Sequence, residues 1–507
     1  MKLRQTLKGL TLTLSLTLAL AGAASAQSTL RIGLAEDPDV LDPTMARTYV
    51  GRIVFASICD KLFDIDEKLN LVPQLALSHT TSADGKTVTI KLRPNVKFHD
   101  GTPMNAEAVK FSLDRHLNLQ GSFRRAEIAQ IDKVEVADPL TVRLLLKSPF
   151  APLMAQLTDR AGMIVSQKAA TAAGDKFGNA PVCAGPYKFV ERVAQDRIVV
   201  ERFADYWDKA RVHVDRIVYR PIQDSTVRLA NLKSGQLDLL ERLLATDIAE
   251  VKKDSKLKLA TGFELGYQGI TMNLANGDKA NSPLGKDARV RRALELSLDR
   301  EAIDQVVFNG LQNVNNQWVN PSNPYYQPKF PTPKRDVAKA KALLKEAGVS
   351  GPLALDFMVP NNPETRAVAE VMQSMAAEAG FDLKIRVTEF ATSLNEAEKG
   401  NFQLYMLAWS GRTDPDGNIY SFASCKGPLN YGKFCDPAID ALLDKARTAA
   451  STAERKALYE QVNSKWLTEG SVLYLYHRAL LFAHGTRLEG FKVMPDGLIR
   501  VTDLKLK

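Results

Sequence analysis

The sequence predicts an α/β protein with two or three lobes, and three observations support this prediction. The chain has 507 residues, of which 45% are hydrophobic and 25% charged, the composition of an ordinary globular protein. At about 150 residues per domain, this length provides two or three separate cores. Between residues 336 and 476, apolar segments with strand character alternate with helical ones, as in a parallel sheet covered by helices.

The elements of the second half follow from the spacing of their apolar residues. Strands are predicted at 353–359, 383–390, 402–409 and 472–476, and helices at 288–309, 336–347, 363–379, 438–449 and 452–467. Gly348 and Gly380 each follow a predicted helix, at the position where a left-handed residue ends a helix. We therefore expect strands and helices to alternate through this half.

The first half has more signals of paired strands. Asp84-Gly85 lies between two segments of alternating hydrophobicity and predicts a hairpin. Asn105 is expected to cap a helix that runs to His116. Extended segments are also predicted at 30–35, 134–136, 141–146, 187–190, 197–203, 214–222, 237–241 and 257–274, and a helix at 44–62.

Residues 1–26 have the pattern of a cleavable signal peptide. Lys2, Arg4 and Lys8 precede an apolar run, and Ala24-Ser25-Ala26 predicts cleavage before Gln27. A membrane anchor is the alternative, but the run is shorter than the ~20 apolar residues that a span needs. No cysteine follows the cleavage site, so we expect a periplasmic protein that is not a lipoprotein.

The basic surplus does not indicate nucleic-acid binding. The 67 Lys and Arg residues and 58 acids give a net charge of +9; without the three basic residues of the signal peptide, 64 against 58 leaves +6. Basic residues alternate with acids along the predicted helices, as in 339–346, which is typical of a solvated face. Export also separates the chain from nucleic acid.

The four cysteines suit an oxidising compartment. Cys425 and Cys435 flank a loop of Gly, Pro and Asn and could form one disulfide, which would leave Cys59 and Cys183 as the second pair. Four cysteines allow three connectivities, and the sequence does not choose among them. A zinc site is the alternative, but the close cysteine spacing of such sites is missing. We expect no metal and no cofactor.

A secreted hydrolase is the competing class of function. The sequence contains no G-x-S-x-G elbow, H-E-x-x-H helix, P-loop or G-x-G-x-x-G loop. The six histidines are scattered singly along the chain. Asp414 and Asp416 could serve acid–base chemistry, yet their neighbours Pro415 and Gly417 are more typical of a turn. The sequence therefore predicts a protein that is not an enzyme.

Residues 91–103, with the sequence KLRPNVKFHDGTP, are similar to the signature of the family 5 solute-binding proteins of ABC importers. Further blocks resemble the family in the same order, at 184–187, 205–207, 234–238, 290–293, 299–300, 409–411, 414–416, 430–431 and 493–496. The resemblance implies a monomeric receptor that passes a small organic solute to an inner-membrane permease. It also implies the two-lobed periplasmic binding protein fold, with a hinge and an additional α+β domain.

By analogy with the family, the chain divides into three parts. Lobe I would combine residues 27–63, 184–284 and 478–507; the additional domain II would be 64–183, and lobe III would be 285–477. The ligand would lie between lobes I and III, which would close around it.

The resemblance also suggests which residues hold the ligand. Trp409, at the end of a predicted strand, and Phe390, at the end of the preceding one, match aromatic residues that line the pocket. Secondary candidates are Tyr49, Asn430, Tyr476 and His477. The alternatives are that Trp409 packs in the core and that His477 belongs to the hinge.

Two arginines depart from the peptide-binding pattern. Arg412 stands where peptide receptors of the family place the Asp that pairs with the peptide ammonium, and Arg47 where an oligopeptide receptor offers an acid. Val359 stands where dipeptide receptors carry an Arg. Our hypothesis is a dipeptide, oligopeptide or peptide-like solute that is anionic or has a masked ammonium group. The alternatives are a glutathione-like, opine-like or acidic compound, and internal pairing of Arg412 with Asp414 or Asp416, or its exposure to solvent.

Overall fold

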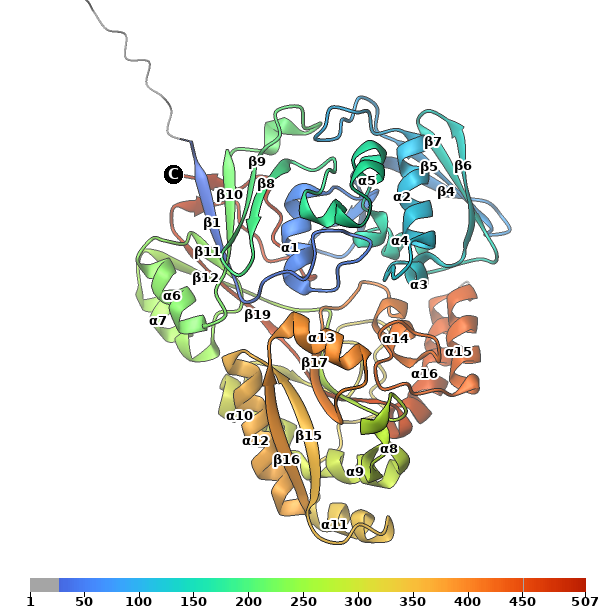
Figure 1. Ribbon diagram of the computed structural model, residues 1–507, viewed down its shortest axis with the longest axis vertical. Coiled ribbons are helices and arrows are strands. Elements are labelled where there is room, and N and C mark those ends of the chain that lie inside the picture. Colours follow the sequence, from blue (N-terminus) through green and yellow to red (C-terminus); the bar gives the residue numbers. More distant parts are fainter. Residues whose placement is uncertain (1–26, 450) are drawn as a thin grey trace, which may run out of the picture.

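The computed structural model describes residues 27–449 and 451–507, and three sheets of four or more strands organise them. Figure 1 shows a seven-stranded and a four-stranded sheet in the upper part of the molecule, and a six-stranded sheet with its helices below them. The predicted signal peptide, residues 1–26, lies outside the described residues. Within the described residues, no helix combines the length and the apolar character that crossing a membrane requires.

The seven-stranded sheet gathers strands from both ends of the chain. Its order is β12 (Leu257–Phe263), β19 (Ala479–Gly485), β11 (Leu239–Leu240), β1 (Thr29–Leu34), β10 (Arg216–Pro221), β9 (Arg197–Arg202) and β8 (Tyr187–Val193). The central strand β1 is parallel to β10 and β11, and its apolar residues share a core with the helix α1 (Tyr49–Ile58). The sheet is therefore complete only when β19, which lies close to the C-terminus, has paired with β11 and β12.

The six-stranded sheet is mixed rather than fully parallel. Its order is β14 (Asn313–Val314), β18 (Val472–His477), β13 (Tyr267–Met272), β17 (Leu404–Trp409), β15 (Leu353–Pro360) and β16 (Phe381–Thr388). Strand β15 is parallel to its neighbours β16 and β17, whereas β13 is antiparallel to its neighbours β17 and β18. The helices that share its core are α9 (Ala288–Ser297), α10 (Arg300–Phe308), α11 (Val337–Glu346) and α12 (Pro363–Ala379).

Several predicted elements differ from the structure. The helix expected at 44–62 is confined to α1, and the extended segment expected at 257–274 is two strands, β12 and β13, that lie in different sheets. The helix expected at 288–309 is broken in two, because Asp299 turns to an extended backbone and its side chain caps α10. The strand expected at 383–390 ends at Thr388, and Phe390 is the first residue of α13 (Phe390–Glu398). The Glu389 carboxylate accepts backbone N–H groups at the start of α13, which explains why the extended conformation stops there.

The four-stranded sheet is an antiparallel unit with its own core. Its order is β4 (Ala76–Thr81), β5 (Thr87–Leu92), β7 (Thr141–Leu146) and β6 (Ile131–Asp138), and the helix α2 (Ala106–Asn118) packs on it. Asp84-Gly85 joins β4 to β5, and Gly85 adopts a φ of 69°. Asn105 caps α2 by accepting the N–H of Ala108, as predicted.

The remaining helices and strands lie outside these three sheets. They are β2 (Phe63–Ile65), β3 (Leu71–Pro73), α3 (Arg125–Ile128), α4 (Leu153–Gln156), α5 (Gln167–Ala173), α6 (Ser225–Lys233), α7 (Ile248–Lys253), α8 (Pro283–Lys286), α14 (Asp416–Ala423), α15 (Pro437–Thr448), α16 (Thr452–Glu469), β20 (Leu488–Glu489) and β21 (Lys505–Leu506).

The chain crosses between the two larger sheets at two adjacent points. One crossing lies between β12 and β13, and the other between β18 and β19. Glu264 and Arg478 lie in these crossings and form a two-armed ion pair, with Nε–Oε1 at 2.9 Å and Nη2–Oε2 at 3.0 Å. The proposed lobe boundaries stay predictions; β13 falls within the 184–284 range expected for lobe I but is hydrogen-bonded in the six-stranded sheet.

Two disulfides use all four cysteines. Cys59 is bonded to Cys183, and Cys425 to Cys435, so the chain adopts the connectivity that contains the predicted loop pair. The first bond joins the end of α1 to the segment that precedes β8, across 124 residues of sequence; the second closes a loop with a separation of 10.

These separations predict unequal contributions to stability. By loop-closure entropy, a crosslink across this longer loop contributes about 5 kcal/mol and one across the shorter loop about 3 kcal/mol. We expect the double variant Cys59→Ala/Cys183→Ala to lose more free energy of unfolding in urea than Cys425→Ala/Cys435→Ala. A larger loss in the second variant would contradict this expectation. Alkylation of the denatured, unreduced protein should modify no cysteine.

Candidate ligand-binding site

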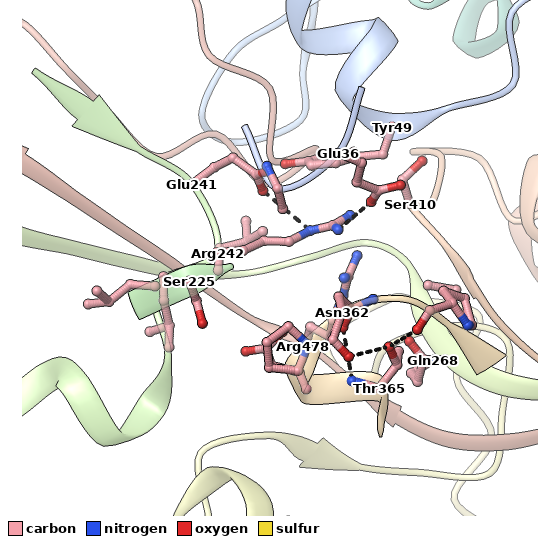
Figure 2. Close-up of a pocket in the computed structure, with 18 of the residues that line it drawn as sticks. Glu36, Tyr49, Ser225, Glu241, Arg242, Gln268, Asn362, Thr365, Ser410 and Arg478 are labelled. Atoms are coloured by element: carbon pink, nitrogen blue, oxygen red, sulfur yellow. Dashed lines mark hydrogen bonds and ion pairs between the residues drawn. The ribbon is translucent and has the colours of Figure 1, made fainter. Parts of the chain in front are cut away.

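A cavity of about 100 Å³ lies between the seven-stranded and six-stranded sheets. Since one water molecule needs about 10–15 Å³ on this scale, the cavity accepts a group of several heavy atoms. One wall comes from the seven-stranded side, with Glu36, Tyr49, Glu241 and Arg242, and the other from the six-stranded side. Figure 2 shows these side chains converging on the cavity. The residues that line it on the six-stranded side include Gln268, Asn362, Glu364, Thr365, Phe390, Trp409, Ser410 and Tyr476.

Helix starts and strand ends place the polar groups of the cavity. Tyr49 is the first residue of α1, after the cap Thr48, and its hydroxyl donates to the Gly497 carbonyl at 2.5 Å. Glu364 lies in the first turn of α12, whose cap is Asn362. Arg242 follows β11 with a φ of 52°, a left-handed conformation that is uncommon for residues other than glycine.

Arg242 is held between two carboxylates. Its Nη1 contacts Glu36, its Nε lies 3.3 Å from Glu241, and its guanidinium lies 5.2 Å from the ring centre of Tyr49. In Figure 2 it extends between the two acids. Burial alone lowers the pKa of Arg242, but the charges of Glu36 and Glu241 outweigh it and raise that pKa above its usual value.

The other two arginines of the cavity are also engaged. Arg478 forms the ion pair with Glu264 described above. Arg228, from α6, donates to the carbonyls of Ile222, Gln223 and Arg242. Within the described residues its Nε has no hydrogen-bond partner, and burial lowers its pKa. The arginines are therefore oriented before any ligand contact.

Aromatic and apolar side chains form the rest of the wall. Trp409 ends β17, and its Nε1 donates to Asn418 at 3.0 Å, which sets the orientation of the indole ring. The Phe422 ring packs against it edge-on, with ring centres 5.0 Å apart. Phe308, Phe390 and Tyr476 also line the cavity. A ligand with an apolar portion could therefore pack against this side.

The structure brings five of the eight predicted ligand residues to the cavity. Trp409, Phe390, Arg47, Tyr49 and Tyr476 line it. The other three, Asn430, His477 and Arg412, are not among the lining residues.

Asn430 and His477 make internal hydrogen bonds. The Asn430 amide donates to the carbonyls of Ser424 and Phe434, which shapes the loop closed by the disulfide of Cys425. His477 ends β18, where its ring nitrogens contact the Gly266 carbonyl and the Asn315 amide. His477 therefore lies directly before the crossing from β18 to β19, and its assignment to a hinge stays a prediction.

Arg412 is buried and pairs with Asp159, which comes from the segment after α4. Its Nε lies 2.9 Å from the Asp159 carboxylate, and its guanidinium lies 4.3 Å from the ring centre of Trp409. Neither of the partners considered from the sequence is available, because Asp414 pairs with Arg455 and Asp416 with Arg447. The side chain of Trp409 therefore lies between Arg412 and the cavity.

Asp159 carries an unusual number of positive neighbours. Arg52 from α1 lies 2.8 Å from the carboxylate, and Arg160 lies 3.7 Å away. Burial raises the pKa of Asp159, but Arg412, Arg52 and Arg160 lower it well below its usual value. Burial lowers the pKa of Arg412 to about 10. Asp159 thus joins a helix of the seven-stranded side to the loop that follows Trp409.

Further contacts join the two sides of the cavity. Arg52 donates to the Ser410 hydroxyl at 3.0 Å, and Arg47 donates to the Asn395 side chain at 2.8 Å and to Glu398 at 3.3 Å. Asn395 and Glu398 belong to α13, on the six-stranded side. The structure therefore has a closed arrangement, in which arginines of the seven-stranded side form hydrogen bonds with residues of the six-stranded side.

Sequence reasoning missed most of the charged residues of the cavity. Glu36, Glu241, Arg242, Glu364 and Arg478 all line it and were not predicted. A partial signal existed in Asn362-Pro363-Glu364-Thr365, a helix start directly after a predicted strand, where the loops of an α/β sheet bind ligands. The other four charged residues lie in segments between strands and helices, where the sequence contains no recognisable motif.

Residues 70–430 match the profile of the bacterial extracellular solute-binding proteins, family 5. The chain belongs to this family. It is similar to the glutathione-binding protein GsiB of Pectobacterium atrosepticum, with 31% identity over 478 residues, which is 92% of each chain. It is also similar to the glutathione-binding protein GsiB of Salmonella typhimurium, with 30% identity over 496 residues and 96% of each chain.

Solved structures show the same fold. The periplasmic binding protein AgaA of A. tumefaciens R10, in complex with agropinic acid, matches with a TM-score of 0.86 and 28% identity over 94% of this chain and 99% of that one. The dipeptide-binding protein of Pseudoalteromonas sp. SM9913, in complex with Met-Leu, matches with a TM-score of 0.88 and 24% identity over 94% and 100%. The predicted two-lobed solute-binding fold is confirmed.

The position of Trp409 predicts a fluorescence signal. Of the four tryptophans, Trp318 and Trp466 are fully buried in a core and Trp207 packs near the four-stranded sheet, so Trp409 alone lines the cavity. We expect intrinsic fluorescence to change when the solute binds, and the change to disappear in Trp409→Phe. The control is Trp207→Phe, which should keep the signal. A full signal in Trp409→Phe would contradict this placement.

Asp159 should be essential for the closed arrangement. Its replacement by Asn leaves Arg52, Arg160 and Arg412 without their shared carboxylate, which costs about 3–5 kcal/mol. We expect Asp159→Asn to weaken solute binding at least tenfold in calorimetry and to lower the melting temperature. Asp175→Asn, at an exposed position elsewhere in the described chain, is the control.

The same carboxylate predicts an effect of pH on stability. Since the pKa of Asp159 is lower in the folded chain than in the unfolded one, its stabilisation is present above about pH 4 and is lost as the pH falls further. The free energy of unfolding of Asp159→Asn should therefore decrease less than that of the wild type as the pH falls below about 4. An unchanged acid transition in a variant with unchanged affinity would contradict the role of Asp159.

Proposed function

We propose that this protein, an extracellular solute-binding protein of an ABC importer, captures a short peptide-like solute that carries both an amine and carboxylates. One observation carries the proposal: the cavity between the sheets holds ionisable groups of both signs in fixed positions. Arg228, Arg242 and Arg478 face it together with Glu241 and Glu364. Within the described residues, Glu364 has no ion-pair partner and the Nε of Arg228 has no hydrogen-bond acceptor, so a purely apolar solute would leave both groups unmatched, at a cost in binding free energy.

The names of the relatives support a solute of this chemistry. Two relatives at 30–31% identity, each aligned over at least 92% of the chain, are named glutathione-binding proteins. Glutathione is a tripeptide with one amine and two carboxylates, so it would offer each sign of charge to the cavity. The apolar wall around Trp409 and Phe390 would accommodate the remainder of such a molecule.

An opine is the second candidate. AgaA, whose structure contains agropinic acid, is 28% identical and covers 94% of this chain. Arg228 keeps a buried Nε without a hydrogen-bond partner within the described residues, which favours a solute that offers a carboxylate there. Both candidates combine nitrogen and carboxylate groups, so direct binding measurements are needed to separate them.

The finer parts of the proposal rest on the sequence. Residues 1–26 would be removed on export to the periplasm, without attachment of a lipid. The protein would act as a monomer that passes its solute to an inner-membrane permease, and it would catalyse no reaction. Generic esterase and peptidase substrates provide a check, because turnover of either would contradict this last point.

Identification of the bound solute tests the proposal directly. The protein is purified without denaturation, the solute is released by acid, and its mass and fragments are determined by mass spectrometry. We expect a peptide-like compound with an amine and at least one carboxylate. Calorimetry with reduced glutathione, Met-Leu and agropinic acid then ranks the candidates. A released solute that lacks either group, together with no heat from the three probes, would overturn the proposal.

A further inference from the structure

One carboxylate of the cavity differs from all the others. Glu364 lines the cavity from the first turn of α12, yet within residues 27–449 and 451–507 it forms no hydrogen bond through its side chain and no ion pair. By contrast, Glu36 contacts Arg242, Glu241 accepts the N–H of Ala35 at 2.7 Å, and Glu264 pairs with Arg478. Glu364 therefore has a charge that the protein itself does not match by direct contact.

The charges around Glu364 leave a negative excess when it is ionised. There are three guanidiniums, of Arg228, Arg242 and Arg478, against four carboxylates, which are Glu364 and three other glutamates. Two of these, Glu36 and Glu241, contact Arg242, and the third, Glu264, contacts Arg478. Arg228 directs its two terminal nitrogens to main-chain carbonyls rather than to Glu364. A cationic group of a ligand placed beside Glu364 would balance this site.

We infer that Glu364 binds the ammonium group of the ligand and makes the cavity select solutes that carry an amine close to a carboxylate. This inference rests on the proposed function and adds the residue that sets its specificity. The same wall supplies the complement for the carboxylate. The Arg478 guanidinium acts on the charge of Glu364 more strongly than those of Arg242 and Arg228, and the Gln268 amide is buried without a hydrogen-bond partner in the described chain.

The titration of Glu364 supports this geometry. Burial raises its pKa above the usual value, whereas Arg478, Arg242 and Arg228 lower it and Glu241 raises it. A bound ammonium would favour the ionised carboxylate and bring this pKa down. Consequently, the affinity for a solute with a free amine should increase as the pH rises through the pKa of Glu364, and should decrease below it.

The inference also revises the hypothesis of a purely anionic solute. That hypothesis depended on Arg412 and Arg47, but Arg412 is paired with Asp159, and Arg47 contacts Glu398 and Asn395. With both arginines engaged, Glu364 is the ionisable group of the cavity that has no partner in the described chain. An anionic solute would have to lie beside it or force it to take up a proton.

The test compares matched probes that differ only at the amine. Calorimetry measures Met-Leu and reduced glutathione against their N-acetylated forms, on the wild-type protein, Glu364→Gln and the control Glu370→Gln, which changes an exposed acid of the same helix. We expect N-acetylation to weaken binding to the wild type and to Glu370→Gln more than tenfold. Glu364→Gln should bind the free amines more than tenfold more weakly and discriminate less than threefold between the two forms.

Two results would overturn the inference. One is a Glu364→Gln variant that folds with an unchanged melting temperature and binds the free amines within twofold of the wild type. The other is a wild-type affinity for free amines that does not fall between about pH 7.5 and pH 4.5, relative to the N-acetylated probes. This second measurement needs no variant, so it decides the question even if Glu364→Gln does not fold.

Failure of the proposed function gives a different result. In that case the wild-type protein would bind none of the probes, with or without the acetyl group, and the released solute would not be peptide-like. If that solute nevertheless contains an amine, its affinity for the wild type and Glu364→Gln is compared in the same way. A released solute without any amine would overturn the inference together with the proposed function.

Discussion

The ion pair between Glu264 and Arg478 is the contact on which the arrangement of this protein depends. It joins the two crossings between the seven-stranded and six-stranded sheets, and the backbone N–H of Glu264 also donates to the Arg478 carbonyl at 3.1 Å. The crossings therefore act as one double connection whose two chains are fixed to each other. Because Arg478 also lines the cavity, the same pair contributes to the electrostatics of the ligand site.

Buried charge is the dominant feature on both sides of Trp409. In front of it lies the cavity, with Arg242 between two acids; behind it lies Asp159, surrounded by Arg52, Arg160 and Arg412. Buried ion pairs add little net stability, because removing each charge from water costs several kcal/mol, but breaking one is expensive. Such clusters therefore define one closed geometry rather than simply holding the lobes together. The indole ring of Trp409 lies between the two clusters and is oriented by Asn418 and Phe422.

Local elements were predicted well where their signals are local. Pro363–Ala379 forms a helix with its predicted limits, and Gly380 ends it with a φ of 103°. Asn105 caps a helix and Asp84-Gly85 forms a hairpin, because caps and tight turns depend on a few adjacent residues. The helix at 288–309 was predicted as continuous, because apolar periodicity continues through Asp299 even though its side chain caps a new helix.

The sequence by itself predicted the family and the alternation of elements, which follow from motifs and from apolar periodicity, and the family resemblance pointed to five residues that line the cavity. Only the tertiary structure decided the charge pairing. Arg412 pairs with Asp159, and Arg242 with Glu36. The two partners of each pair are so far apart in the sequence that no local pattern could indicate the pairing. The physical reason is that an ion pair forms between charges that the fold buries together, because desolvation makes an unpaired buried charge costly. Glu364 remained without such a partner, and this, too, could be seen only once both walls of the cavity were in place.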